Sequence, residues 1–125
     1  MVDVLLPAAP EAAFRARQSL GELRASLDPR VFEDLRLLVS ELVTNSLRHA
    51  GLSGRDQIRL QVTLTDSAVR VEVCDGGPGF ALSGETPSLY RQSGWGLFLM
   101  KQIADRWGIH RDRESCVWFE LSRAR

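Results

Sequence analysis

Residues 39–51 read VSELVTNSLRHAG, and their spacing is typical of the last turns of a long helix. Glu41, Asn45 and His49 follow one another at steps of four, so they lie along one side of that helix. This polar row overlaps the edge of an apolar stripe made of Val31, Leu35, Leu38, Val39, Leu42 and Ser46. A carboxylate or amide at such an edge is partly desolvated, which costs about 1–3 kcal/mol for each unpaired group. We therefore expect a ligand to use this row, although a solvated helix edge is the alternative interpretation.

The overall composition indicates one globular domain, residues 1–125, with 44% hydrophobic and 26% charged residues. Sixteen basic and sixteen acidic residues give a net charge of zero, so no overall field attracts nucleic acid or an anionic membrane. No apolar run approaches the roughly 18 residues needed to span a bilayer, and the first residues do not resemble a signal peptide. We therefore expect a cytoplasmic protein without direct nucleic-acid or membrane partners.

Two cysteines, Cys74 and Cys116, each lie inside an apolar, strand-like run without metal-ligand spacing. We expect them to be reduced and buried, as is usual in cytosolic proteins, with a structural disulfide as the less favoured alternative. His110 stands alone near a predicted turn, and the sequence assigns it no role.

The first half of the chain predicts a strand and two helices. Residues 2–6 form an apolar run that ends at Pro7, which suits an edge strand. A helix is predicted over about residues 10–27, because proline and an acid favour its first turn. Asp28 is the expected N-cap of a second helix, which continues to about residue 49. The inner stripe of the first helix is predicted to be Ala13, Phe14, Arg17, Leu20, Leu23 and Leu27.

The second half predicts a sheet interrupted by a long loop and one more helix. Alternating apolar residues over 58–64 and 69–74 predict a hairpin with one buried face. Residues 75–93 break all periodicity, so we expect a functional loop there. A helix over 94–107 and strands near 108–112 and 117–121 complete the chain. This order predicts an α+β fold, a two-layer α/β sandwich with helices on one face of a mixed, mostly antiparallel sheet.

Two further segments carry residues suited to binding a ligand. Residues 75–79 read DGGPG after a buried strand, where glycines permit close backbone approach and Asp75 can accept a hydrogen bond from an exocyclic amine. Residues 93–97 read SGWGL and open a helix, whose free N–H groups and positive dipole end attract an anion. Taken singly, a plain turn and an ordinary helix start are alternative interpretations.

The three motifs together, in this order, resemble the GHKL superfamily of ATPases, which includes gyrase and the histidine kinases. The shared pattern is acid-x-x-x-Asn on a helix, Asp-x-Gly-x-Gly after a strand, and Gly-x-Gly-Leu into a helix. Within the superfamily the chain is similar to bacterial anti-sigma factor serine/threonine kinases, through residues 6–7, 40–50, 104–108 and 117–121. The resemblance covers nearly the whole chain and implies a Bergerat-type ATP-binding fold.

The resemblance implies a role for each residue that matches the pattern. Asn45 would hold Mg²⁺, and Glu41 would be the general base toward an acceptor hydroxyl. Asp75 would read the adenine amino group. The other implied ATP-site residues are His49, Gly77, Gly79, Gly94, Gly96, Leu97 and Cys116.

The resemblance also implies ATP and Mg²⁺ as cofactors and two protein partners, an anti-sigma factor antagonist and a sigma factor. The implied function is phosphorylation of a serine or threonine of the antagonist and sequestration of the sigma factor, with homodimerisation a further expectation. Trp95 stands where these kinases commonly carry Arg, and Cys116 where Thr is usual. Both departures favour an alternative, a non-catalytic or degenerate ATP-binding switch that acts through protein contacts. An autophosphorylating histidine kinase fits poorly, because the sequence has no separate helical hairpin with an acceptor histidine.

Overall fold

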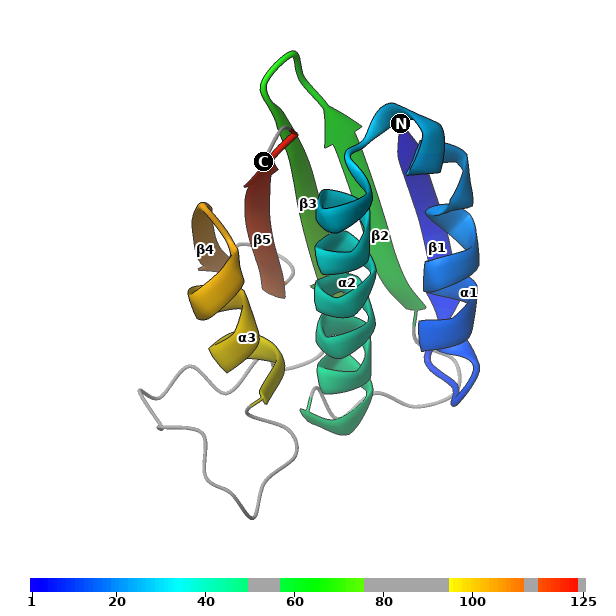
Figure 1. Cartoon of the computed structure of the whole chain (residues 1–125). Helices are drawn as coiled ribbons and strands as arrows, with labels where there is room; N and C mark the ends of the chain where they lie inside the picture. Colours follow the sequence, from blue (N-terminus) through cyan, green and yellow to red (C-terminus); the bar gives the residue numbers. More distant parts are fainter. Residues whose placement is uncertain (50–56, 76–94, 112–114, 124–125) are drawn as a thin grey trace.

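The computed structural model describes residues 1–49, 57–75, 95–111 and 115–123. Its elements are, in chain order, β1 (Val2–Pro7), α1 (Ala12–Ser19), the 3₁₀-helix η1 (Gly21–Ser26), α2 (Pro29–His49), β2 (Gln57–Leu64), β3 (Ala68–Asp75), α3 (Trp95–Ile103), β4 (Arg106–Arg111) and β5 (Ser115–Ser122). The strands form one sheet in the order β1-β2-β3-β5-β4, and the helices lie on one of its faces (Figure 1). The predicted two-layer sandwich is confirmed. All pairings among the described strands are antiparallel, so the sheet is not mixed.

The hydrophobic core lies between the sheet and the helices. Alternate residues of β2 and β3 are buried in it, as the pattern of the hairpin predicts. The predicted inner stripe of α2 is confirmed, because all six members are fully buried. This stripe fixes α2 against β3 and β5, and therefore fixes the direction of the polar row along its edge. No helix in the described ranges is long and apolar enough to cross a membrane.

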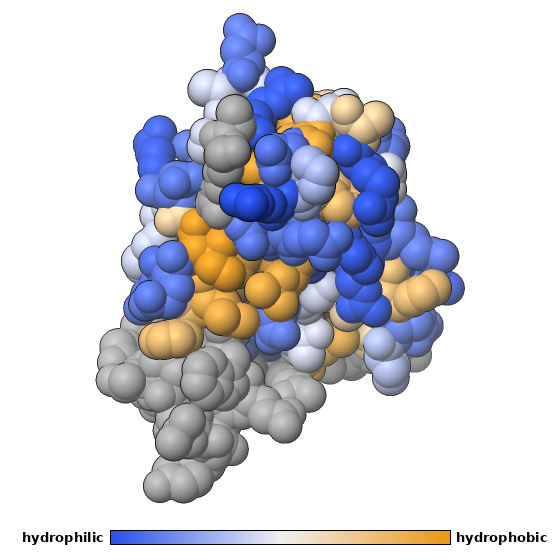
Figure 2. Space-filling model, viewed as in Figure 1, coloured by the Kyte–Doolittle hydropathy of each residue, from blue (hydrophilic) through white to orange (hydrophobic). Residues whose placement is uncertain are grey.

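Hydrophobic side chains also reach the surface on the helix-bearing face. Figure 2 shows them gathered over α3, with polar side chains over most of the rest of this face. Phe98 of α3 is 38% exposed, and Leu37 of the neighbouring α2 is 40% exposed. Some exposed apolar side chains are ordinary on a protein surface.

The helix predicted over residues 10–27 is divided in the structure. α1 ends at Ser19, and backbone N–H groups of Leu20 and Leu23 then donate to carbonyls three residues earlier, at 3.2 and 2.9 Å. Such bonds define the tighter 3₁₀ turn that continues as η1. Gly21 at this junction is a weak helix former, which explains why the α-helix stops there.

The inner face of α1 also differs from the predicted stripe. Phe14 is 53% exposed, whereas Ala12, Ala16 and Leu20 are fully buried at steps of four. Two alanines on the inner face allow the α1 backbone to approach its neighbours closely. The prediction is wrong for Phe14, whereas Leu20, Leu23 and Leu27 are buried as predicted.

The helix predicted over residues 94–107 ends earlier, at Ile103, and β4 begins at Arg106. The backbone N–H of Asp105 donates to the carbonyl of Glu120 at 2.9 Å. The N–H of Ser122 donates to the Asp105 carboxylate at 2.7 Å. From Asp105 onward the backbone therefore bonds to β5 instead of continuing the helix. Trp107 accordingly lies in β4 rather than in α3.

The cysteines differ from the expectation of two free thiols. Cys74 of β3 and Cys116 of β5 form a disulfide, with their Cα atoms 4.1 Å apart. The two residues are direct partners in the antiparallel register, so their side chains meet on one face of the sheet. The sequence could not reveal this, because the pairing of β3 with β5 joins segments 42 residues apart.

Candidate functional site

Polar side chains from three elements come to one end of the sandwich. The C-terminal half of α2, the end of β3, the start of β5 and the start of α3 all lie at the lower end of the view in Figure 1. Glu41 and Asn45 belong to α2, Asp75 ends β3, and Ser115 begins β5. The structure therefore brings two of the three sequence motifs to the same end of the molecule.

Asn45 is 4% exposed, and Glu41, one helical turn before it, is half-buried. Within the described part of the chain, the Asn45 amide makes no hydrogen bond. The hydroxyl oxygen of the adjacent Ser46 is buried and also lacks a described partner. Leaving such groups unpaired costs about 1–3 kcal/mol each, which favours a bound ligand over a purely structural role. The Asn45 carbonyl oxygen is a ligand type that suits Mg²⁺.

Asp75 and Ser115 are direct partners across β3 and β5. Asp75 is fully buried and Ser115 is 5% exposed. Both residues are two positions from core valines, Val73 and Val117, so they lie on the helix-bearing face of the sheet. The end of the sheet below α2 thus offers a buried carboxylate and a hydroxyl side by side.

Cys116 is not part of this pair, which corrects its predicted place in the ATP site. Successive side chains of a strand point to opposite faces, so Cys116 faces away from Asp75. Its sulfur is bonded to Cys74 on that opposite face. The hydroxyl beside Asp75 belongs instead to Ser115, which the sequence interpretation missed. The signal was available, because Ser115 keeps the alternation of Val117, Phe119 and Leu121.

The third motif is only partly described. α3 begins at Trp95, Gly96 follows in its first turn, and Leu97 packs partly buried against the core. His49 is the last residue of α2. The predicted site residues Gly77, Gly79 and Gly94 lie outside the described residues.

A separate hollow of about 440 Å³ lies on the other flank of α2. Its lining residues are Ala8, Ala9, Pro10, Thr44 and Leu47. None of them carries a carboxylate, a side-chain amide or a cationic group, so this hollow has no charged side chain for phosphates or a metal ion. The polar end formed by Asn45, Asp75 and Ser115 is therefore the better candidate for a nucleotide site.

The amino-acid sequence matches a known family over nearly its whole length. The family described as histidine kinase-like ATPase domain matches residues 6–121. The chain belongs to this family. Membership of an ATPase domain family implies that this domain binds ATP, which agrees with the cofactor expected from the three motifs.

Relatives of this ATPase domain include kinases and anti-sigma factors. It is 32% identical to the serine-protein kinase RsbW of Listeria monocytogenes over 126 residues, covering 89% of this chain and 80% of that protein. It is 32% identical to the anti-sigma F factor of Clostridium botulinum over 110 residues, covering 79% and 76%. The predicted resemblance to anti-sigma factor kinases is therefore confirmed.

Solved structures of histidine kinases share the fold. The catalytic domain of the histidine kinase ThkA superposes with a TM-score of 0.58 at 15% identity, covering 99% of both chains. The histidine kinase domain of the Erythrobacter litoralis EL346 blue-light activated kinase gives 0.58 at 18% identity, covering 86% of this chain and 61% of that one. At these identities the likeness concerns the fold alone.

Proposed function

We propose that this ATPase domain binds Mg-ATP at the end formed by α2, β3 and β5 and phosphorylates a serine or threonine of an anti-sigma factor antagonist. It would sequester a sigma factor when the antagonist is absent. The observation that carries the proposal is Glu41 one helical turn before the buried Asn45, in a chain 32% identical to RsbW over most of its length. The same residues would also suit a domain that binds ATP without transferring its phosphate, so phosphoryl transfer needs its own test.

Asp75 and Ser115 are proposed to hold the adenine ring. A carboxylate oxygen accepts a hydrogen bond from the exocyclic amine of adenine, and burial of the carboxylate strengthens that bond. Guanine carries a carbonyl oxygen at that ring position, so the carboxylate would face another acceptor. The pair should therefore favour ATP over GTP.

Asn45 and Glu41 are proposed to act at the phosphate end. Asn45 would supply one oxygen ligand to Mg²⁺, which when bound neutralises charge on the phosphates. Glu41 would accept the proton of the serine or threonine hydroxyl as its oxygen bonds to the γ-phosphorus. The bond from the γ-phosphorus to the bridging oxygen breaks at the same time, and ADP leaves with the electron pair. Glu41 is only half-buried, so a protein hydroxyl can reach it.

Calorimetric titration with ATP, with and without Mg²⁺, tests the binding part of the proposal. Wild type should bind in a Mg²⁺-dependent manner, and Asn45→Ala should lose that dependence. Glu33→Gln is a matched control on the same helix, because Glu33 is an exposed carboxylate whose ion pair with Arg36 lies on the surface. If Asn45→Ala binds Mg-ATP as wild type does, the assignment of Asn45 is wrong.

Transfer is tested separately with γ-labelled ATP and a purified anti-sigma factor antagonist. Glu41→Gln should keep its affinity for ATP within a few-fold and lose at least 100-fold in the rate of transfer, the range expected for removal of a general base. Unchanged transfer by Glu41→Gln would refute its role while leaving ATP binding intact.

The second candidate function is a non-catalytic switch that binds ATP and acts only through protein contacts. Trp95 at the start of α3, in place of the usual Arg, is the observation that favours it. Cys116 does not favour this second function, because Ser115 provides the hydroxyl next to Asp75. Sustained phosphoryl transfer at saturating Mg-ATP would exclude this second function.

A further inference from the structure

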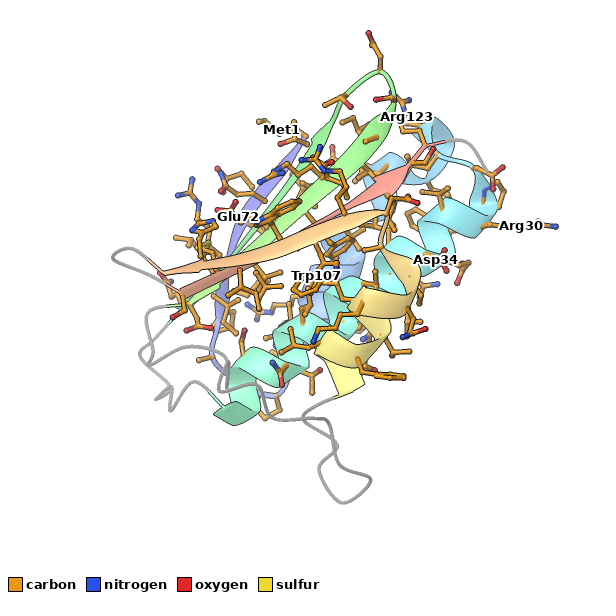
Figure 3. All side chains as sticks on the ribbon, turned by 90° about the vertical axis from the view of Figure 1, so that its left-hand side faces the viewer. Met1, Arg30, Asp34, Glu72, Trp107 and Arg123 are labelled. Atoms are coloured by element: carbon orange, nitrogen blue, oxygen red, sulfur yellow. A yellow bond between two sulfur atoms is a disulfide. The ribbon has the colours of Figure 1, made fainter. Side chains whose placement is uncertain are left out.

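The face of the sheet turned away from the helices carries a second cluster of reactive side chains. Cys74, Cys116 and His110 are register partners in one row across β3, β5 and β4. Glu72 precedes Cys74 by two residues on β3, so it points to the same face. Figure 3 shows Glu72 on the side of the sheet opposite the helices. None of these four residues belongs to the proposed nucleotide site.

The donor atoms of the cluster are close together. One carboxylate oxygen of Glu72, Oε1, lies 3.4 Å from Sγ of Cys74. The other, Oε2, lies 3.5 Å from Nε2 of His110. The donor atoms of Glu72, Cys74 and Cys116 all lie within 4.8 Å of one another. Glu72 thus stands between the sulfur atoms and the imidazole.

Two of these separations fit a tetrahedral metal site. Zinc bonds to sulfur, nitrogen and oxygen are about 2.0–2.3 Å long, which places neighbouring donors about 3.3–3.8 Å apart. The two distances made by Glu72 fall in this range. The two sulfur atoms are closer together than this, because they are bonded to each other.

A structural disulfide alone does not explain the cluster. A disulfide sulfur has no proton, so Cys74 in this state gives the Glu72 carboxylate no hydrogen bond. Neither a carboxylate nor an imidazole is needed to hold two paired strands together. Two thiolates, an imidazole and a carboxylate are, however, a ligand set that suits Zn²⁺.

The cluster is accessible from solvent. The side chains of His110 and Glu72 are 43% and 26% exposed, while the two cysteines are each 4% exposed. A cation could therefore enter past the imidazole and the carboxylate and reach sulfur atoms that are shielded from water. A site with exposed imidazole and carboxylate ligands and buried sulfur atoms is suited to binding a metal ion from solvent.

We propose that Cys74, Cys116, His110 and Glu72 form a redox-gated Zn²⁺ site on the outer face of the sheet. A dithiol reductant supplies two electrons and two protons, which break the S–S bond and leave two thiols, while the reductant becomes a disulfide. Zn²⁺ then binds both sulfurs, Nε2 of His110 and one oxygen of Glu72, and two thiol protons are released. A disulfide oxidant takes two electrons from the two zinc-bound thiolates and two protons from water and becomes a dithiol, while the S–S bond between Cys74 and Cys116 reforms and Zn²⁺ is released.

Cobalt titration of the full chain tests this site, because Co²⁺ reports thiolate ligands and tetrahedral geometry by its absorption. Protein reduced anaerobically with a phosphine should bind one equivalent of Co²⁺ and show thiolate-to-cobalt charge transfer, and Zn²⁺ should abolish the signal. Oxidised protein should show none. Circular dichroism of the reduced protein establishes that the titrated chain is folded.

Two variants separate a four-ligand site from binding by thiols alone. Glu72→Gln and His110→Gln keep both cysteines, and each should weaken Co²⁺ binding at least tenfold. Glu120→Gln is the control, because Glu120 lies on the same face but pairs with Arg70 and Arg106 instead. The proposal is overturned if reduced wild type binds no Co²⁺, if oxidised protein gives the same signal, or if both variants bind as tightly as wild type. No nucleotide is present, so these outcomes are independent of the proposed kinase function.

Discussion

At the scale of single residues, Trp118 explains why position 108 is a glycine. Gly108 of β4 is the register partner of Trp118 on β5. A Cβ atom added to Gly108 would lie 2.5 Å from the indole nitrogen. The indole is held in place, because the guanidinium of Arg70 stacks on it at 4.2 Å and is itself bound to Glu120 at 3.1 Å.

Gly108→Ala should therefore destabilise the protein by overpacking. We expect the free energy of unfolding to fall by about 1–3 kcal/mol, measured by urea denaturation. Gly21→Ala is the matched control, because nothing lies within 4 Å of the added methyl group, and its effect should be near zero or slightly stabilising. Combining Gly108→Ala with Trp118→Val should recover part of the loss. Equal stability of Gly108→Ala and wild type would show that Trp118 can move aside.

Ser115 provides a prediction specific to the nucleotide site. If its hydroxyl supports Asp75 in holding adenine, Ser115→Ala should weaken ATP binding by about 2–10-fold, the loss expected for one hydrogen bond. Ser122→Ala at the other end of β5 should leave ATP affinity unchanged. Isothermal titration of both variants compares them directly, and equal affinities would remove Ser115 from the site.

At the scale of elements, the start of α2 depends on Asp28. Its Oδ1 accepts a hydrogen bond from the backbone N–H of Arg30 at 2.8 Å, which confirms the predicted N-cap. Asp28→Ala should lower the free energy of unfolding by about 1 kcal/mol, and Asp28→Asn should restore most of it. Thermal or urea unfolding of the pair measures the difference, and a loss in Asp28→Asn as large as in Asp28→Ala would argue against capping.

The pairing of β1 with β2 should depend on pH through Asp3. Hydrogen bonds from Arg59, at 3.1 and 2.9 Å, lower the pKa of the Asp3 carboxyl below its usual value of 3.8. A lowered pKa in the folded state means that the contribution is present above pH 3.8 and is lost as the pH falls through the folded value. The stability difference between wild type and Asp3→Asn should therefore shrink from pH 6 to pH 3. A difference that stays constant over this range would contradict the role of the Asp3 charge.

Elements were predicted well where local signals decide them. The cap at Asp28 and the unbroken apolar stripe define α2, and strict alternation defines β2 and β3. Predictions failed where distant contacts decide. The end of α3 is set by bonds from Asp105 to β5, and the inner face of α1 by the packing of Ala12 and Ala16. Neither contact leaves a periodic signal in the nearby sequence.

At the scale of the whole molecule, the central pairing of β3 with β5 is what the sequence could not provide. The fold class and the family follow from motifs that are each local, such as Glu41 with Asn45. The register of β3 against β5 is not local, yet it decides that Ser115 lies beside Asp75 and that Cys116 meets Cys74. It also brings His110 of β4 into the outer row, where the sequence assigned it nothing.

Because it links β3 to β5, the disulfide is expected to stabilise the whole fold. It joins strands that are 42 residues apart, so in the unfolded chain it closes a loop of that size and removes conformational freedom. Loop-closure entropy for this length corresponds to about 4 kcal/mol, an upper value because native-state strain reduces the gain. Reduction of wild type should therefore lower the free energy of unfolding by about 2–4 kcal/mol in urea. The double variant Cys74→Ser, Cys116→Ser should show no response to reductant. If wild type unfolds at the same urea concentration in both redox states, β3 and β5 are held by the backbone ladder and the core alone.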